Sequence, residues 1–234
     1  MFFRNPFKKL SKFERMLWVT SVVVVTSSFL LVGSTSVLTL IASLVGVTAL
    51  IFVAKGDVWG QILTVSFSVL YAIISLKFKY FGEMITYLGM TAPIAILSIV
   101  SWLKNPYNNS TEVEVNSLTK IQKTALLILT PTITFIFYFI LLFFNTNNLF
   151  FSTVSIATSF AASYLMLYRS PFYALAYAAN DIVLITLWVL AAAKDASYVP
   201  MVICFTMFLL NDIYGYLSWL GMKKRQKTKI ILAD

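Results

Sequence analysis

The sequence predicts an all-α polytopic membrane protein with eight membrane-spanning helices. Of its 234 residues, 59% are hydrophobic and only 12% are charged, and the mean hydropathy is +0.85. Soluble domains average about 25% charged residues, so this composition excludes an ordinary soluble protein. The apolar residues form eight segments, each close to the roughly 20 residues that a helix needs to cross a bilayer. Almost the whole chain is therefore expected to lie within the membrane.

The first predicted span runs from Met16 to Val32 and follows a basic, aromatic segment, FFRNPFKKLSKFER. We interpret it as a retained span, because no small-residue cleavage site precedes a soluble domain as a signal peptide would require. The seven further spans are predicted at 36–54, 58–78, 84–103, 124–144, 149–168, 172–193 and 198–221.

The longest polar interval, 104–123, reads KNPYNNSTEVEVNSLTKIQK and divides the chain nearly in half. Polar residues, Pro and Asn indicate a loop there. Within the span that precedes it, Pro93 lacks an amide donor and predicts a kink that can serve as a hinge.

The basic residues predict the orientation. With eight spans, fifteen of the 18 Lys and Arg residues fall on one side, and only Lys77, Lys79 and Lys194 fall on the other. Because Lys and Arg concentrate in cytoplasmic loops, both termini are predicted to be cytoplasmic. The chain has no His, and its one cysteine, Cys204, lies in an apolar run. We therefore expect no metal site, no cofactor and no intramolecular disulfide.

The two halves resemble each other at a shift of about 117 residues. Ser101-Trp102 at the end of the fourth span matches Ser218-Trp219 at the end of the eighth, and Tyr71 and Thr64 match Trp188 and Asp181. A shift of four spans preserves direction, so the halves are predicted to be parallel repeats, an arrangement found in transporters with the site at the repeat interface.

The clearest candidate for a functional element is the run NDIVLITLW, from Asn180 to Trp188, in the seventh span. A carboxylate at the centre of a span costs roughly 3 kcal/mol on insertion scales and is normally kept where it faces a bundle interior. Asp181 is such a residue, and Trp188 lies two helical turns further on the same face. This stripe predicts a binding surface for a polar, flat and cationic molecule.

A second run, Asn211-Asp212 followed by Trp219, repeats the spacing in the last span. Asn211 lies deeper in its segment than Asn180 does, so the two Asp residues are expected at different depths, with Asp181 and Asn211 directed towards one cavity. Gln61, near the start of the third span, is the strongest polar candidate in the first half.

Enzymatic function finds little support, and we expect no enzyme. Phosphate-binding glycine loops, nucleophile elbows and His-based catalytic groups are missing from the sequence. An intramembrane aspartyl-type hydrolase using Asp181 and Asp212 is the competing alternative, but it needs both carboxyl groups at the same depth.

The chain resembles the PnuC-type nicotinamide riboside transporters, a family related to the SWEET sugar transporters. The resemblance is carried by KKLSKFERMLW near the N-terminus, by NDIVLITLW, and above all by LLNDIYGYLSWLGMKKRQ, Leu209 to Gln226. It extends over nearly the whole chain in span pattern.

The resemblance implies a division of the chain into an N-terminal segment and additional first span (1–33), a three-helix bundle (34–104), a cytoplasmic loop and linker helix (105–145), a second bundle (146–222) and a basic cytoplasmic tail (223–234). It also implies uptake of nicotinamide riboside by facilitated diffusion with alternating access, cytosolic trapping by phosphorylation, a bacterial inner membrane location and a homo-oligomer such as a trimer.

The residue chemistry and the resemblance agree on the substrate site. Trp188 is predicted to stack on the pyridinium ring, Asp181 to offset its charge, and Asn180, Asn211 and Gln61 to hydrogen-bond the amide and hydroxyls. The predicted substrate-binding residues are Gln61, Tyr71, Asn180, Asp181, Trp188, Asn211 and Tyr214. The first half is sparse in Trp and Asn on its core face, so thiamine or a deoxynucleoside is the alternative substrate.

Overall fold

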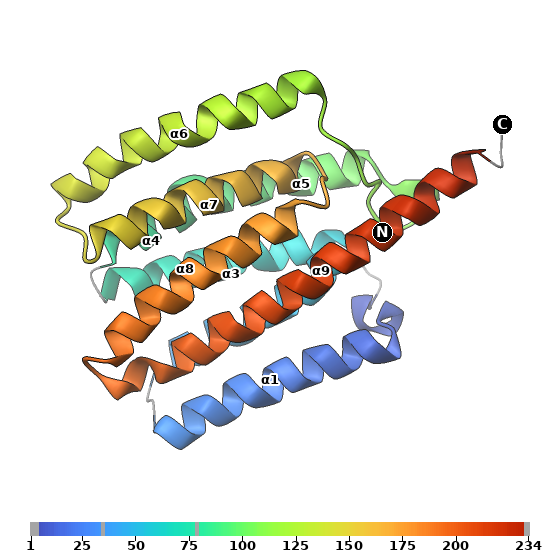
Figure 1. Ribbon diagram of the computed structural model, residues 1–234. Helices are drawn as coiled ribbons and strands as arrows, with labels where there is room; N and C mark the ends of the chain where they lie inside the picture. The colour runs from blue at the N-terminus through green and yellow to red at the C-terminus, as the bar shows by residue number, and fades with distance from the viewer. Residues whose placement is uncertain (1–4, 34–35, 78–79, 232–234) are drawn as a thin grey trace.

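The computed structural model describes residues 5–33, 36–77 and 80–231, and they form a helical bundle (Figure 1). Its helices are η1 (Pro6–Lys9), α1 (Lys12–Val32), α2 (Val37–Ala54), α3 (Val58–Lys77), α4 (Phe81–Thr86), η2 (Tyr87–Thr91), α5 (Ala92–Lys104), η3 (Tyr107–Asn109), α6 (Lys120–Phe143), α7 (Leu149–Leu167), α8 (Tyr173–Ala192), η4 (Ala196–Tyr198) and α9 (Val199–Ile231).

Eight helical segments within the described ranges are long and apolar enough to cross a membrane, and α4, η2 and α5 together make the fourth of them. The predicted fold class is confirmed, and the predicted spans agree with the helices to within a few residues at most boundaries. The last helix is the exception, since α9 continues about ten residues beyond the predicted end at residue 221. Figure 1 shows this extension projecting past the other helices.

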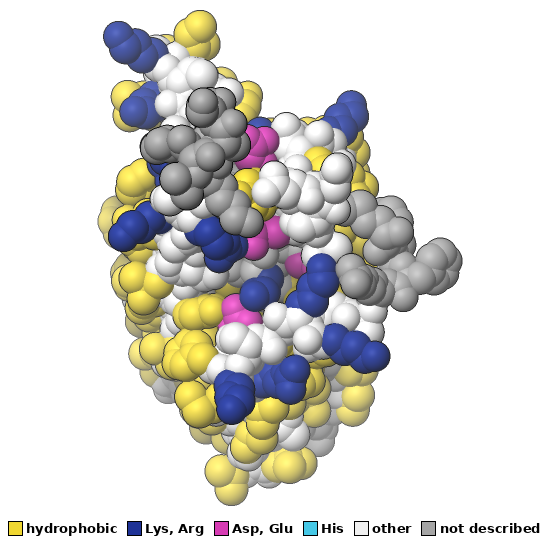
Figure 2. Space-filling view, turned by 90° about the vertical axis from the view of Figure 1, so that its right-hand side faces the viewer, with side chains coloured by type: hydrophobic (Ala, Val, Ile, Leu, Met, Phe, Trp, Pro, Cys, Tyr) yellow, Lys and Arg dark blue, Asp and Glu magenta, His cyan; other side chains and the backbone are white. Residues whose placement is uncertain are grey.

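The helix η1, the C-terminal end of α9 and the loop between α5 and α6 lie at one end of the bundle, on the right in Figure 1; we call it the basic end. Figure 2 looks onto this end and shows Lys and Arg side chains spread over it, with fewer Asp and Glu side chains between them. The opposite end, with the α6–α7 and α8–α9 connections, is called the distal end. Lys194 lies in a distal connection, whereas Lys79 is outside the described residues.

Local sequence signals explain where helices begin and end. Ser11 and Glu14 form a reciprocal capping box at the start of α1, and Thr119 and Gln122 form another at the start of α6. Each box satisfies amide groups that have no partner inside the helix. Gly33 ends α1 with φ of +68°, a left-handed conformation that glycine adopts without steric cost.

The two edges of the bundle are formed by α1, which packs against α2 and α9, and by α6, which packs against α7 (Figure 1). Between them, α2 contacts α3 and α9, and α8 contacts α7 and α9. Most of α6 is exposed on the surface, as suits a helix that faces lipid. The division into two three-helix bundles, with α6 as linker and α1 as an addition, remains our interpretation of these contacts.

The two halves of the chain are tied together by matching contacts. The Ser101 hydroxyl and the Trp102 indole donate to the carbonyls of Leu167 and Met166, at distances of 3.2 and 3.5 Å, where α7 ends.

Reciprocally, the Ser218 hydroxyl and the Trp219 indole donate to the carbonyls of Ala54 and Val53, at 2.8 and 2.9 Å, where α2 ends. In each half, a Ser-Trp pair therefore donates hydrogen bonds to the end of a helix in the other half, from α5 to α7 and from α9 to α2. These two Ser-Trp pairs are the ones matched by the shift of 117 residues.

The α5–α6 loop is held against the C-terminal extension of α9. Arg225 forms an ion pair with Glu112, in which one guanidinium nitrogen donates to both carboxylate oxygens, at 2.6 and 2.7 Å. The Gln226 amide donates to Glu112 and to the Val113 carbonyl and accepts from the Val115 amide. With Gln226 only 4% exposed, this network fixes the loop at the basic end.

The fourth span contains an irregularity next to its proline. The backbone makes a π-helical turn at η2, immediately before Pro93 in the first turn of α5. Such turns are rare and often lie at functional sites. The sequence predicts a kink at Pro93, and the irregular turn lies on the N-terminal side of it.

Candidate functional site

A buried cavity lies between helices from both halves of the chain. Its polar lining consists of Gln61, Thr64, Tyr87, Thr91, Tyr177, Asn180, Asp181 and Asp212. The apolar lining comes mainly from α2, together with Phe67 and Phe208. The cavity volume is about 50 Å³, far below the roughly 300–1,000 Å³ of typical ligand pockets. A nucleoside therefore enters only after the surrounding helices move apart.

Asp181 and Asp212 both line this cavity and interact with each other. They are 4% and 3% exposed, and one carboxylate oxygen of Asp181 has no hydrogen-bond partner. The expectation that the two residues lie at different depths is wrong, because antiparallel α8 and α9 pack along their length and bring the two carboxyl groups together. Two acidic groups side by side in a low-dielectric interior are costly to ionise together, and a bound cation offsets that cost.

Asn180 is held in position by three hydroxyl groups of α7. Its side-chain oxygen accepts hydrogen bonds from Ser155 at 3.2 Å, Thr158 at 2.8 Å and Ser159 at 3.0 Å. Because these bonds occupy the oxygen, the amide NH₂ of Asn180 remains the group available to the cavity. Asn180 thus presents a positioned hydrogen-bond donor.

Gln61 supplies a second amide from the first half of the chain. It is 1% exposed, lines the cavity, and its NH₂ nitrogen has no hydrogen-bond partner. A buried donor without a partner is unfavourable by roughly 1–3 kcal/mol, which a substrate oxygen can recover on binding.

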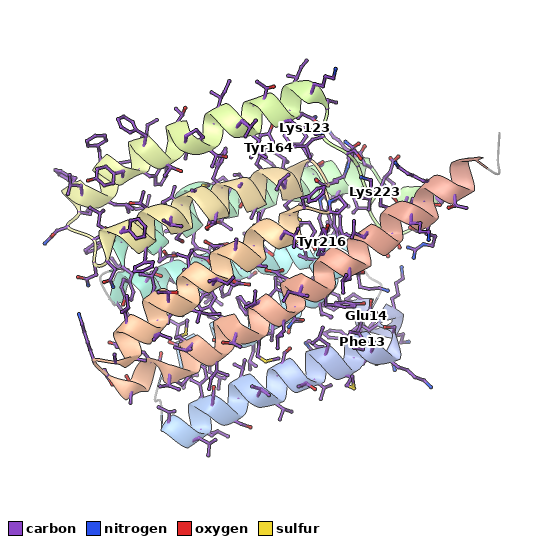
Figure 3. All side chains as sticks on the ribbon, in the orientation of Figure 1. Phe13, Glu14, Lys123, Tyr164, Tyr216 and Lys223 are labelled. Carbon is purple, nitrogen blue, oxygen red and sulfur yellow. The ribbon has the colours of Figure 1, made fainter. Side chains whose placement is uncertain are left out.

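Asn211 and Tyr214 are not part of the cavity lining. Asn211 donates to the Ser21 hydroxyl at 3.0 Å, and the Tyr214 hydroxyl donates to Glu14 at 2.8 Å. Glu14 also pairs with Lys55 at 3.3 Å. Glu14 lies near the basic end of α1 (Figure 3). The Asn211–Ser21 and Tyr214–Glu14 hydrogen bonds hold α1 against α9.

Tyr71 and Trp188 meet each other away from the lining of the cavity. The Trp188 indole donates to the Tyr71 hydroxyl at 3.0 Å, and both rings are almost completely buried. They belong to an aromatic cluster nearer the distal end. The prediction that Trp188 stacks on substrate is therefore not supported at the cavity in this conformation.

Of the seven predicted site residues, the structure brings Gln61, Asn180 and Asp181 together. It adds Asp212. The repeated Asn-Asp pair marks this residue in the sequence, but the sequence predicts a role for it only in the hydrolase alternative. It also adds Tyr87 and Tyr177, for which tyrosine in an apolar span gives no distinguishing signal.

The comparisons with known proteins agree with this architecture. Residues 36–221 match the family model described as nicotinamide mononucleotide transporter. A nicotinamide riboside transporter PnuC of Neisseria mucosa is 26% identical over 190 residues, which cover 79% of this chain and 72% of that protein. A protein of the same name from Haemophilus influenzae is 25% identical over 190 residues, covering 80% and 81%.

The fold is also similar to a solved structure, described as the crystal structure of the vitamin B3 transporter PnuC. The TM-score is 0.81 at 24% sequence identity, covering 93% of this chain and 94% of the other. The match extends over nearly all eight spans, so the likeness includes the whole bundle.

Since the family model covers most of the chain, the bundle is a multi-pass inner-membrane transporter, and the hydrolase alternative for the Asp181–Asp212 pair is set aside. The chain belongs to the nicotinamide mononucleotide transporter family.

Proposed function

We propose that this chain carries nicotinamide riboside across the membrane through the cavity lined by Asp181 and Asp212. The proposal is supported by the names of the two relatives and by the chemistry of the cavity. The observation that carries it is the buried pair of acidic groups beside two amide NH₂ donors.

The charge of the lining favours a nucleoside over a nucleotide. Nicotinamide riboside carries a positively charged pyridinium ring and a neutral ribose, and the carboxyl pair attracts that cation. The described lining includes neither Lys nor Arg. A phosphate group carries a charge of about −1.5 to −2 at pH 7, so the mononucleotide is repelled by the carboxyl pair.

The proposed site residues are Asp181 and Asp212 for the cation, and Asn180 and Gln61 for the carboxamide and ribose oxygens. Tyr87 and Tyr177 add hydroxyl groups at the edge of the same cavity. Thiamine, which is also a planar organic cation, and a deoxynucleoside remain the alternative substrates.

We further propose transport by facilitated diffusion with alternating access, followed by phosphorylation in the cytosol that traps the product. We predict that both termini lie in the cytoplasm, because most of the Lys and Arg residues belong to the basic end. The homo-oligomer stays a prediction. The exposed apolar surfaces of α1 and α6 suit contact with lipid.

Uptake into proteoliposomes tests the proposal. Purified protein should accumulate labelled nicotinamide riboside down its gradient, without a sodium or proton gradient, and should not accumulate the mononucleotide. Asp181→Asn should weaken affinity about 10-fold or more, because it removes the acid with the unpartnered oxygen. Asp212→Asn should have the smaller effect.

An unrelated surface variant, Lys194→Gln, serves as the control and should leave uptake unchanged. Preferential uptake of thiamine or of a deoxynucleoside would reassign the substrate. Transport that depends on an ion gradient would contradict facilitated diffusion.

A further inference from the structure

Near the distal end, a second acidic group is buried without a partner. Glu83, on the first turn of α4, is 2% exposed, and neither of its carboxylate oxygens has a hydrogen-bond partner. The Ser155 hydroxyl, which donates to Asn180 at 3.2 Å, also lies beside Glu83. A buried carboxylate without a partner is strongly unfavourable, so its presence indicates a ligand or a role.

Three tyrosine side chains lie near this carboxylate. Tyr71, Tyr80 and Tyr87 lie close enough to interact with it electrostatically. The Trp188 ring packs against Tyr80 with centroids 5.4 Å apart and against Tyr71 at 6.5 Å. A carboxylate together with nearby aromatic rings is the chemistry that recognises planar or quaternary organic cations.

Tyr87 separates this group from the cavity of Asp181 and Asp212. It lines that cavity, while its ring contacts Tyr71 with centroids 4.5 Å apart. Tyr87 also begins the π-helical turn η2, where the regular helical hydrogen bonding of the fourth span is interrupted. A small change in this turn can therefore move the ring that stands between the two sites.

We propose that Glu83, with the rings of Tyr71, Tyr80 and Trp188, forms a second binding site for the planar organic cation on the distal side of Tyr87. The substrate class depends on the function proposed above. The site holds the cation before it passes Tyr87 to the pair Asp181–Asp212. Trp188 and Tyr71 thereby contact substrate at the distal site, outside the lining of the main cavity.

The test is to remove only the charge of Glu83. Glu83→Gln keeps the size of the side chain and should retain the melting temperature or raise it, because an unpaired buried carboxylate is lost. We expect the KM for nicotinamide riboside to rise about 10-fold. The reduced, dihydro form of the nucleoside has nearly the same shape but no charge, and its KM should change less than twofold. Glu83→Asp keeps the charge, and its KM for nicotinamide riboside should lie between those of the wild type and Glu83→Gln.

Asp195→Asn is the matched control. Asp195 is an exposed acid at the distal end. Hydrogen bonds from the backbone amide of Ser197 and, to a smaller extent, from its side chain lower the pKa of Asp195 and keep it charged. This variant removes the same charge at the same end without touching the aromatic group, and it should leave both KM values unchanged.

A binding measurement tests the distal site independently of transport. The bare pyridinium cation 1-methylnicotinamide should bind wild-type protein in a calorimetric titration about 10-fold more tightly than it binds Glu83→Gln. Equal affinities, or KM changes that are equal for the charged and neutral nucleosides, would overturn the distal site. Failure of wild-type protein to transport nicotinamide riboside, while this binding difference persists, would overturn only the proposed function.

Discussion

At the residue scale, neighbouring positions on one helix have different roles because they point in different directions. Asn211 binds α1 through Ser21, while Asp212 lines the cavity. Successive residues are about 100° apart around an α-helix, so one step along the chain moves a side chain to another face. The packing of α1 and α8 against α9 therefore decides which of these two residues, Asn211 or Asp212, lines the cavity.

Asn180 provides a residue-scale prediction. Asn180→Leu removes the acceptor of three hydroxyl groups and the donor that faces the cavity. We expect uptake of nicotinamide riboside to fall at least 10-fold and stability to fall by ~1–3 kcal/mol. Both are measured on purified protein, by proteoliposome uptake and by thermal unfolding.

Ser159→Ala is the control, because it removes one of the three donors and leaves two. It should retain most of the uptake and of the stability. If Asn180 only joined α7 to α8, the Asn180→Leu protein that remains folded would bind substrate with wild-type affinity, and its place in the site would be lost.

At the element scale, the close contact between α2 and α3 depends on a glycine. A Cβ added at Gly60 would lie 2.4 Å from the backbone nitrogen of Val53 and 2.9 Å from the carbonyl carbon of Phe52. Backbone atoms cannot rotate away as the end of a side chain can. Only glycine allows the two helices to pack at this distance, next to the cavity residue Gln61.

Gly60→Ala should therefore destabilise the protein by ~1–3 kcal/mol or more, since α2 and α3 must move apart. Gly221→Ala is the matched control: nothing lies within 4 Å of its Cβ position. Gly221→Ala should be neutral or should stabilise α9 by about 0.5–1 kcal/mol. Thermal unfolding of the two variants in the same detergent compares them, and equal melting temperatures would show that the helix contact adapts to a methyl group.

At the scale of the whole molecule, the two halves of the chain are joined by reciprocal contacts. The residues matched at a shift of 117 meet in pairs: Tyr71 bonds Trp188, and the rings of Trp102 and Trp219 lie 5.5 Å apart. Such pairs are expected near an axis that relates two parallel repeats, where equivalent residues face each other. The cavity lies between the same two halves, and transporters built from repeats bind their substrates at the repeat interface.

The orientation of the molecule is a prediction at this scale. A single cysteine at Lys194 should react with a membrane-impermeant maleimide in intact cells, whereas one at Lys227 should react only after the membrane is opened. Cys204 is buried, so the unmodified chain supplies a low background in the same assay. The reverse pattern would place both termini outside.

The sequence by itself determined the number of spans and their order, because the length of an apolar segment is set by the bilayer whatever the segment packs against. It also identified Gln61, Asn180 and Asp181, because polar groups inside a membrane must face the interior of the bundle. Only the tertiary structure decided which face of α9 meets the cavity, and that Trp188 and Tyr71 lie with Glu83 near the distal end. Lipid and protein interior are both apolar, so hydrophobic periodicity in a span does not reveal which neighbour a face will meet.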